Sequence, residues 1–346
     1  MWAAREGEGR ASPIREGPAL LGRSIGPAFA LLVLSPFLAE VLSGSTPLPL
    51  LIVFPPFAIL DLCLYGCAAL AIRELAVRLG RGWLSIAAMG VAFAIAEEGL
   101  VVATFFDPTA PPRQAFGAWG AGPDGTNWVW IPLLCAYHSL VSICLPILIA
   151  QLAYPSRAAQ PWLSKRRLVL AGVFFLFGMG LGRLLFTSGS FGAGYYARLA
   201  PWQLAASLVA IAGLAALALV LPARIHFRWP VLRAPRPVLV AAISAVTFAV
   251  FFVSGWGGKD LGLTPLQALL GAMLAAILGV AGLAVASSGV GWSDRHRLAV
   301  PAGVIAFYVL LSPVIDPPFG LAVGALSAVA LWRGWRREAL RAVAMR

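Results

Sequence analysis

Long apolar runs separated by short polar segments make up nearly the whole chain. Ten of these runs approach or exceed the roughly 20 helical residues that cross about 30 Å of hydrocarbon. They lie at roughly 26–43, 48–72, 83–106, 127–153, 168–188, 201–222, 238–254, 265–287, 298–315 and 317–332. The pattern predicts an all-α polytopic membrane protein of about ten transmembrane helices. Only Asp316, Pro317 and Pro318 mark the boundary between the last two runs, so a hairpin that does not fully cross is an alternative there.

The composition leaves no room for a soluble domain. Apolar residues make up 60% of the 346 positions and charged residues only 12%, a balance that a water-soluble fold of this length cannot bury. Residues 25–335 therefore form a single transmembrane domain. Residues 1–24 mix Arg and Glu with Gly and Pro and are predicted to be a disordered cytoplasmic tail, while 336–346 form a basic cytoplasmic tail.

The basic residues indicate how the chain is oriented. With the N-terminus inside, 22 of the 26 Lys and Arg residues fall in inside segments and only Arg113, Arg198 and Lys259 in outside loops. This is the positive-inside bias, and it predicts that both termini are cytoplasmic. The net charge of +12 is thus explained by topology, which excludes nucleic acid as a partner and leaves the lipid bilayer. The scarcity of Lys beside abundant Ala, Gly, Arg and Pro favours the plasma membrane of a bacterium.

Four acidic residues lie within apolar runs, where ionisable groups are costly and usually have partners or functions. They are Glu40, Asp61, Glu97 and Glu98. Glu40 is close to the outer end of its run, and we expect it to be hydrated. Asp61 follows Pro55 and Pro56, and a helix broken by Pro beside an acid is either an ion or proton site or a kink filled by a polar side chain.

The adjacent Glu97 and Glu98 have a counterpart in the next helix. Glu97 lies fourteen residues after Trp83, and His138 lies eleven residues after Asn127 in the antiparallel run that follows. At about 1.5 Å of rise per residue, the carboxylates and the imidazole reach similar depths and are expected to touch. Small residues on the face of Glu97, such as Gly90, would let the neighbouring helix approach.

Helical periodicity separates the two glutamates and groups other polar residues with the histidine. Glu98 points about 100° away from Glu97 in an α-helix, so we expect Glu97 to be the working base and Glu98 its support. Asn127 and Ser142 share the stripe of His138 and are candidate assisting residues. Arg183, inside the fifth run, either neutralises a buried Glu or extends to the outer interface.

This set of residues supports two functions of different class. A Glu beside a His in a dehydrated pocket can activate water as a general base, with the imidazole stabilising the developing oxyanion. Alternatively, Asp61, Glu97, Glu98 and His138 form the relay of a proton- or ion-coupled transporter for a small solute. A third interpretation is a hydrogen bond that only holds two helices together.

A Glu-Glu pair in one transmembrane helix followed by a His in the next resembles the CAAX-protease and bacteriocin-processing family of glutamic intramembrane proteases. The resemblance covers about residues 80–155. It implies a metal-independent endopeptidase acting on a membrane-embedded peptide, with Glu97 as base, Glu98 as helper and His138 on the oxyanion side. The chain departs from that family's motifs, because no Arg follows the pair at the expected spacing and Leu134 stands where the second motif has Phe.

No cofactor is expected. Two carboxylates and one His fall short of a convincing metal-ligand set, so no metal is expected either. The four cysteines lie inside apolar runs, where free Cys usually packs as a small hydrophobe.

Overall fold

The regular elements of the described chain are all helices, which confirms the all-α fold. The computed structural model describes residues 26–107, 119–188, 199–223, 233–315, 322–327, 329–330 and 333. The predicted tails at 1–24 and 336–346 lie outside the described residues, and the predicted run at 317–332 is described only in part.

Several helices of the first half change their winding along their length. The elements there are α1 (Pro27–Pro36), η1 (Phe37–Val41), α2 (Leu48–Val53), α3 (Pro55–Asp61), η2 (Leu62–Gly66), α4 (Cys67–Arg78), α5 (Trp83–Ala94), η3 (Ile95–Val101), α6 (Trp130–Tyr137), η5 (His138–Cys144), α7 (Leu145–Ala153) and η6 (Pro155–Arg157). The segments η1, η2, η3 and η5 are π-helical and continuous with their α-helical neighbours, whereas η6 is a short 3₁₀ turn.

The second half consists of long uninterrupted helices. They are α8 (Lys165–Thr187), α9 (Pro201–Val220), α10 (Pro237–Trp256), α11 (Pro265–Ser287) and α12 (Asp294–Ile315). Within the described residues, seven helices are long and apolar enough to cross a bilayer, and Pro27–Val41 is a shorter apolar helix. The 22-residue α12 covers the predicted run at 298–315. The protein is therefore a multi-pass membrane protein.

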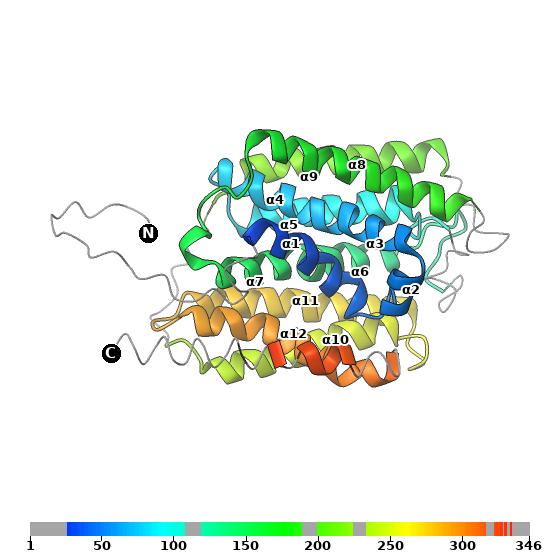
Figure 1. The fold of residues 1–346 in the computed structure, drawn as a ribbon. Coiled ribbons are helices and arrows are strands. Elements are labelled where there is room, and N and C mark those ends of the chain that lie inside the picture. The colour runs from blue at the N-terminus through cyan, green and yellow to red at the C-terminus, as the bar shows by residue number, and fades with distance from the viewer. Residues whose placement is uncertain are drawn as a thin grey trace.

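The helices run side by side in three layers (Figure 1). Helices α8 and α9 form one outer layer, α10 to α12 form the other, and the helices from α3 to α7 lie between them with α1. The central spans Pro55–Arg78, Trp83–Val101 and Trp130–Ala153 are each 67% buried, whereas the four spans from α8 to α11 are 17–22% buried. The central layer is thus shielded by protein, and the outer helices present apolar side chains for lipid.

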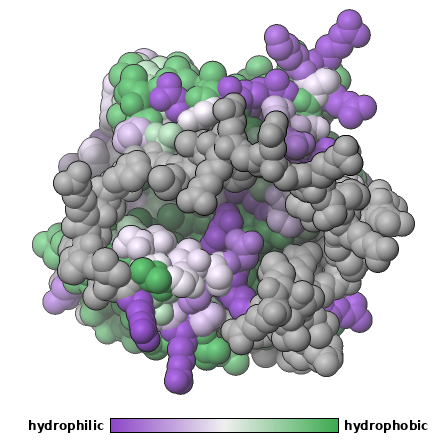
Figure 2. All heavy atoms as spheres, turned by 90° about the vertical axis from the view of Figure 1, so that its left-hand side faces the viewer, coloured by the Kyte–Doolittle hydropathy of each residue, from purple (hydrophilic) through white to green (hydrophobic). Residues whose placement is uncertain are grey.

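One end of the bundle differs in polarity from its sides. Figure 2 looks onto the end at which α5 and α8 begin, and shows hydrophilic side chains at its rim and near its centre, with hydrophobic side chains between and behind them. An apolar belt with polar ends is what a bilayer requires of a bundle.

Arg73 is one of the basic residues that the positive-inside pattern places in an exposed polar segment, but the structure buries it. Helix α4 continues through it to Arg78, and Arg73 and Glu74 are both 0% exposed. Their ion pair measures 2.6 Å from Nη1 to Oε1, and the Arg73 guanidinium lies 3.6 Å over the ring of Trp162. The two charges can be buried because the segment after α7 supplies carbonyl acceptors to Arg73 and backbone N–H donors to Glu74.

Candidate functional site

Glu97, Glu98 and His138 meet in the central layer, as their depths predict. The Nε2 atom of His138 lies 3.1 Å from Oε1 of Glu98 and 3.2 Å from Oε2 of Glu97. The three residues are only 3 to 7% exposed. Two carboxylates therefore converge on one imidazole nitrogen in a protein-shielded region.

All the segments that supply this cluster are π-helical. Glu97 and Glu98 lie on η3, and His138 begins η5. Tyr65 lies on η2 and Glu40 on η1. π-helical turns are rare in proteins and occur frequently at functional sites, since the wider turn re-aims side chains.

The π-helical winding also corrects the expectation that Glu98 points away from Glu97. The helical-wheel argument assumes α-helical winding, in which neighbouring residues diverge by about 100°. In η3 the i→i+5 turn is wider, and the long side chains of both glutamates reach the same nitrogen. Both residues are consequently direct partners of His138.

Close packing brings the two helices together. A Cβ atom added to Gly90 on α5 would lie 2.8 Å from Cα of Ser139, which directly follows His138. The helices can approach this closely only because position 90 has no side chain, as the small residue predicted. Ser139 also donates from Oγ to the carbonyl of Ala87, at 2.8 Å.

Tyr65 and Thr104 hold the outer sides of the two carboxylates. The Tyr65 hydroxyl donates to Oε1 of Glu97 at 2.7 Å, and the Thr104 hydroxyl donates to Oε2 of Glu98. Trp130 in turn donates from Nε1 to the Thr104 oxygen at 3.1 Å. The turn before Thr104 places Ala103 at φ 58°, the left-handed region that strains an L-residue.

The two glutamates are not equivalent in this network. Both oxygens of Glu98 have a hydrogen-bonding partner. Oε2 of Glu97 is buried and, among the described residues, has no hydrogen bond of acceptable geometry, although it lies near the imidazole. Oε2 of Glu97 thus differs from both oxygens of Glu98 in having no hydrogen bond of acceptable geometry among the described residues.

The predicted assisting residues divide into groups. Ser142 contacts the imidazole directly, with Oγ 3.0 Å from Nδ1 of His138, and so fixes the ring. Asn127 instead organises the turn before α6, because its Oδ1 accepts from the N–H of Trp130 at 2.8 Å and its Nδ2 donates to the carbonyl of Trp119 at 3.1 Å. Asn127 is thus a structural residue of that turn.

Asp61 and Arg183 lie in the same part of the fold but are not placed in the cluster by any contact described here. Asp61 ends α3 and is 5% exposed, and its Oδ2 has no hydrogen-bonding partner among the described residues. Arg183 lies on α8, where the preceding Gly182 packs against Val101 of η3 and Leu60 of α3. Assisting roles for both residues stay predictions.

Sequence reasoning missed Tyr65, Thr104 and the connection of Glu40. Glu40 is partly exposed, which agrees with the expected hydration, and it also accepts a hydrogen bond from Thr46 at 2.8 Å and interacts electrostatically with Tyr65. In the sequence, Tyr65 can be interpreted as an aromatic side chain that packs within an apolar run, four residues after Asp61. A buried tyrosine hydroxyl nevertheless requires a hydrogen-bonding partner. The need of its hydroxyl for a partner is the signal in the sequence that could have identified Tyr65 as part of the network.

The cluster also has the atoms to bind a cation. Glu97, Glu98 and His138 each offer one ligand atom, and these atoms all lie within 4.8 Å of one another. Oxygen and imidazole ligands suit divalent first-row ions. The sequence predicts no metal here, so a chelator and added metal belong in any test of the site.

Comparison with protein families identifies the chain at the level of the family. Residues 29–335 match an uncharacterized membrane protein family, and the chain therefore belongs to it. This family is distinct from the CAAX-protease and bacteriocin-processing family, whose resemblance to the Glu-Glu and His pattern is not confirmed by the match. Neither the curated proteins nor the solved structures gave a match to this chain.

Proposed function

We propose that this membrane protein is a hydrolase of the glutamic intramembrane peptidase type, in which Glu97, Glu98 and His138 activate a water molecule. The observation that carries the proposal is the convergence of two buried carboxylates on Nε2 of one imidazole, at 3.1 and 3.2 Å. A purely structural contact between two helices needs only one such carboxylate. The unsatisfied Oε2 of Glu97 favours this residue as the general base.

The chemistry follows from the positions of these groups. Glu97 takes a proton from water, and the water oxygen attacks the carbonyl carbon of a peptide bond. His138 is held by Ser142 at Nδ1 and by Glu98 at Nε2, and the positive charge of its protonated form stabilises the negative charge that develops on the carbonyl oxygen. When the C–N bond breaks, the proton held by Glu97 passes to the leaving amine. Water is thereby consumed, and one carboxyl and one amino terminus are formed.

The test is proteolysis in H₂¹⁸O with the purified full chain in liposomes and a library of membrane-spanning peptides. The wild type is expected to produce new carboxyl termini that contain ¹⁸O, in the presence or absence of a chelator. Glu97→Gln and His138→Ala are expected to reduce this product by at least about 10²-fold, the typical contribution of general acid–base catalysis. Asp260→Asn, in an exposed loop, is the matched control and should retain wild-type activity.

Two results would contradict the proposal. Equal ¹⁸O incorporation by the wild type and Glu97→Gln would show that any cleavage has another source. Loss of cleavage on chelation, with recovery on adding a divalent ion, would replace the metal-independent mechanism by a metal-assisted one at the same residues.

A specific observation favours a second function, a proton-coupled transporter. Tyr65 donates to Glu97, and Glu40 interacts electrostatically with Tyr65 and His138, so the polar network extends from His138 toward the end of η1. Chains of acidic, Tyr and His side chains at this depth are typical of proton pathways. A pH-sensitive dye inside liposomes distinguishes the two functions, because a transporter moves protons across the bilayer under an imposed gradient. Peptide hydrolysis needs no gradient.

A further inference from the structure

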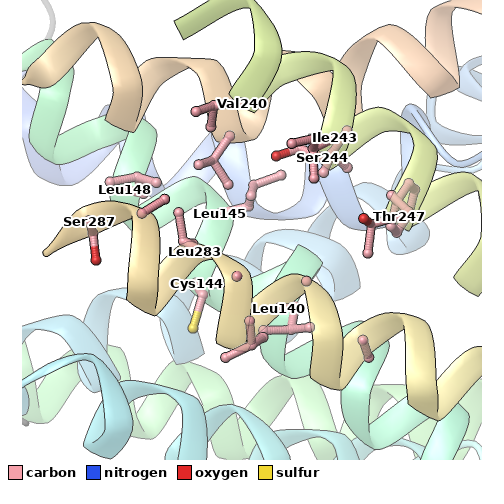
Figure 3. Close-up of a pocket in the computed structure, with 18 of the residues that line it drawn as sticks. Leu140, Cys144, Leu145, Leu148, Val240, Ile243, Ser244, Thr247, Leu283 and Ser287 are labelled. Atoms are coloured by element: carbon pink, nitrogen blue, oxygen red, sulfur yellow. The ribbon is translucent and has the colours of Figure 1, made fainter. Parts of the chain in front are cut away.

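A cavity lies beside the helix that carries His138. Its volume is about 490 Å³, and it is bordered by that helix, the start of α5, and α10, α11 and α12. Tyr137, Leu140, Val141 and Cys144 line it, whereas His138 and Ser142 do not. Figure 3 shows Leu140, Cys144, Leu145 and Leu148 on one side of the cavity, with Val240, Ile243, Ser244 and Thr247 of α10 across from them. The volume lies within the range of ligand-binding pockets.

The cavity is elongated along the bundle. Its lining on α11 extends from Ala276 to Ser287, which corresponds to about 16 Å of helix at 1.5 Å per residue. Half of a hydrocarbon core of about 30 Å is about 15 Å. The cavity therefore has the depth of one membrane leaflet. Its deeper end is aromatic, with Phe248 and Phe251 of α10.

The other end of the cavity is basic. Arg297 of α12 lines it, together with Trp292 and with Pro235, which lies between Arg233 and Ala234 on one side and Arg236 on the other. The segment before α10 is fixed against the turn before α12, because His296 Nε2 lies 2.8 Å from the carbonyl of Pro235.

Charge at that end is only partly balanced. Arg297 pairs at 2.9 Å with Asp294, and this pair is 37% and 48% exposed. Arg233 and Arg236 lie two residues before and one residue after the lining residue Pro235 in the chain, and Trp83 of α5 also lines the cavity. Tryptophans mark the interface between hydrocarbon and headgroups. Basic pockets between transmembrane helices at this depth bind anionic lipid headgroups.

We propose that this cavity binds an anionic phospholipid, with one acyl chain between α7 and α10–α11 and the phosphate at Arg297. The apolar lining, the leaflet depth and the basic end together match an amphiphile with one negatively charged headgroup. A soluble anion would leave the lining beside Phe248 empty, and a neutral lipid would bring no negative charge to the basic end of the cavity.

The experiment is a titration followed by native mass spectrometry of the full chain in detergent. Phosphatidylglycerol and phosphatidylcholine with identical acyl chains are the probes. We expect one tightly bound phosphatidylglycerol, with at least about fivefold preference over phosphatidylcholine, the effect of roughly one arginine contact. Arg297→Gln should weaken phosphatidylglycerol binding by about fivefold, whereas Arg167→Gln, an exposed arginine of α8, should not. Glycerol 3-phosphate, which has the charge without the chain, should not compete.

A second pair of variants tests the place of the acyl chain. Leu283→Trp fills the cavity and should abolish the single tight binding event, while Leu274→Trp, on the exposed part of the same helix, should leave it intact. Equal binding of the two lipids overturns the proposal, and so does equal binding to the two tryptophan variants. Competition by glycerol 3-phosphate also overturns it, because the site would then recognise charge alone.

Discussion

At the residue scale, the two adjacent glutamates have different surroundings. Glu98 is held by Thr104 on one oxygen and by His138 on the other. Glu97 accepts a hydrogen bond from Tyr65 on Oε1, whereas its Oε2 lies 3.2 Å from Nε2 of His138 without a hydrogen bond of acceptable geometry. A carboxylate with both oxygens bonded is suited to orient an imidazole, and one with an unused oxygen is suited to accept a proton. The division of roles thus follows from hydrogen bonding and not from position on a helical wheel.

Loss of the buried ion pair is expected to destabilise the fold strongly. Glu74→Ala leaves the fully buried Arg73 without its carboxylate, and breaking a buried pair in this way costs about 3–5 kcal/mol. The measurement is the midpoint of thermal unfolding in a fixed detergent and at a fixed scan rate. The matched control is Asp294→Ala, which breaks the exposed pair with Arg297 and should change the stability by less than about 1 kcal/mol. Equal shifts for the two variants would contradict the importance of the buried pair.

Individual residues of the cluster were only partly predictable from the sequence. Charge inside an apolar run identifies Glu97 and Glu98, and similar depth connects them to His138. Tyr65 and Thr104 carry no charge, so their participation depends on a tertiary contact that periodicity does not encode. Asn127 shares the stripe of His138, but the chain leaves helical geometry before α6 begins, and the stripe therefore does not extend to it.

At the element scale, the contact between α5 and η5 sets the spacing of the cluster. Gly90→Val would place methyl groups against Ser139, where even a Cβ atom would lie 2.8 Å from the backbone. We expect a loss of about 1–3 kcal/mol from overpacking, together with loss of any hydrolytic activity as Glu97 and His138 separate. Both are measured on the same detergent-purified sample.

Gly213→Val is the control for this helix contact. Gly213 lies on α9 with open space around the position of an added Cβ, so the substitution tests a valine in a transmembrane helix without a clash. A variant at position 90 that is as stable and as active as the variant at position 213 would show that the two helices need not approach so closely.

The winding of the elements was not predictable. Apolar run length located the helices that carry the cluster, within a few residues of their observed ends. The π-helical turns at η1, η2, η3 and η5 were missed, because a period of 3.6 residues was assumed throughout. A π turn sacrifices the usual i→i+4 bonding and persists only where surrounding contacts favour it. Those contacts involve residues far away in the sequence.

At the scale of the whole molecule, the orientation in the membrane is open to a direct test. The positive-inside bias predicts that the start of α8 faces the cytoplasm and that the loop between α10 and α11 faces outside. In intact cells, a membrane-impermeant maleimide should label Asp260→Cys, and it should label Arg167→Cys only after permeabilisation; both positions are exposed. The unmodified chain is the control, because its four cysteines lie within helices. The reverse labelling pattern would invert the topology.

The layered arrangement could not be derived from hydropathy. The mean hydropathy of the central spans, 1.7 to 2.1, is only slightly below the 2.1 to 2.4 of the spans of α8 to α11, yet the central spans are 67% buried and the others only 17–22%. Lipid and protein interior are almost equally apolar, so hydrophobicity does not distinguish a central from a peripheral helix. The intramembrane acids are the better indicator, since Asp61, Glu97 and Glu98 all lie on central spans.

The buried charges at the end of α4 depend on a segment of the chain that is synthesised later. Arg73 and Glu74 receive their partners from Ala158 and Trp162, which are 85 and 88 residues further along the chain. At about 5–20 residues per second, the ribosome needs roughly 4 to 17 seconds to make that stretch. During this delay the end of α4 must stay where water solvates both charges. We therefore expect this end of α4 to reach its final place only after the segment that follows α7 has been synthesised.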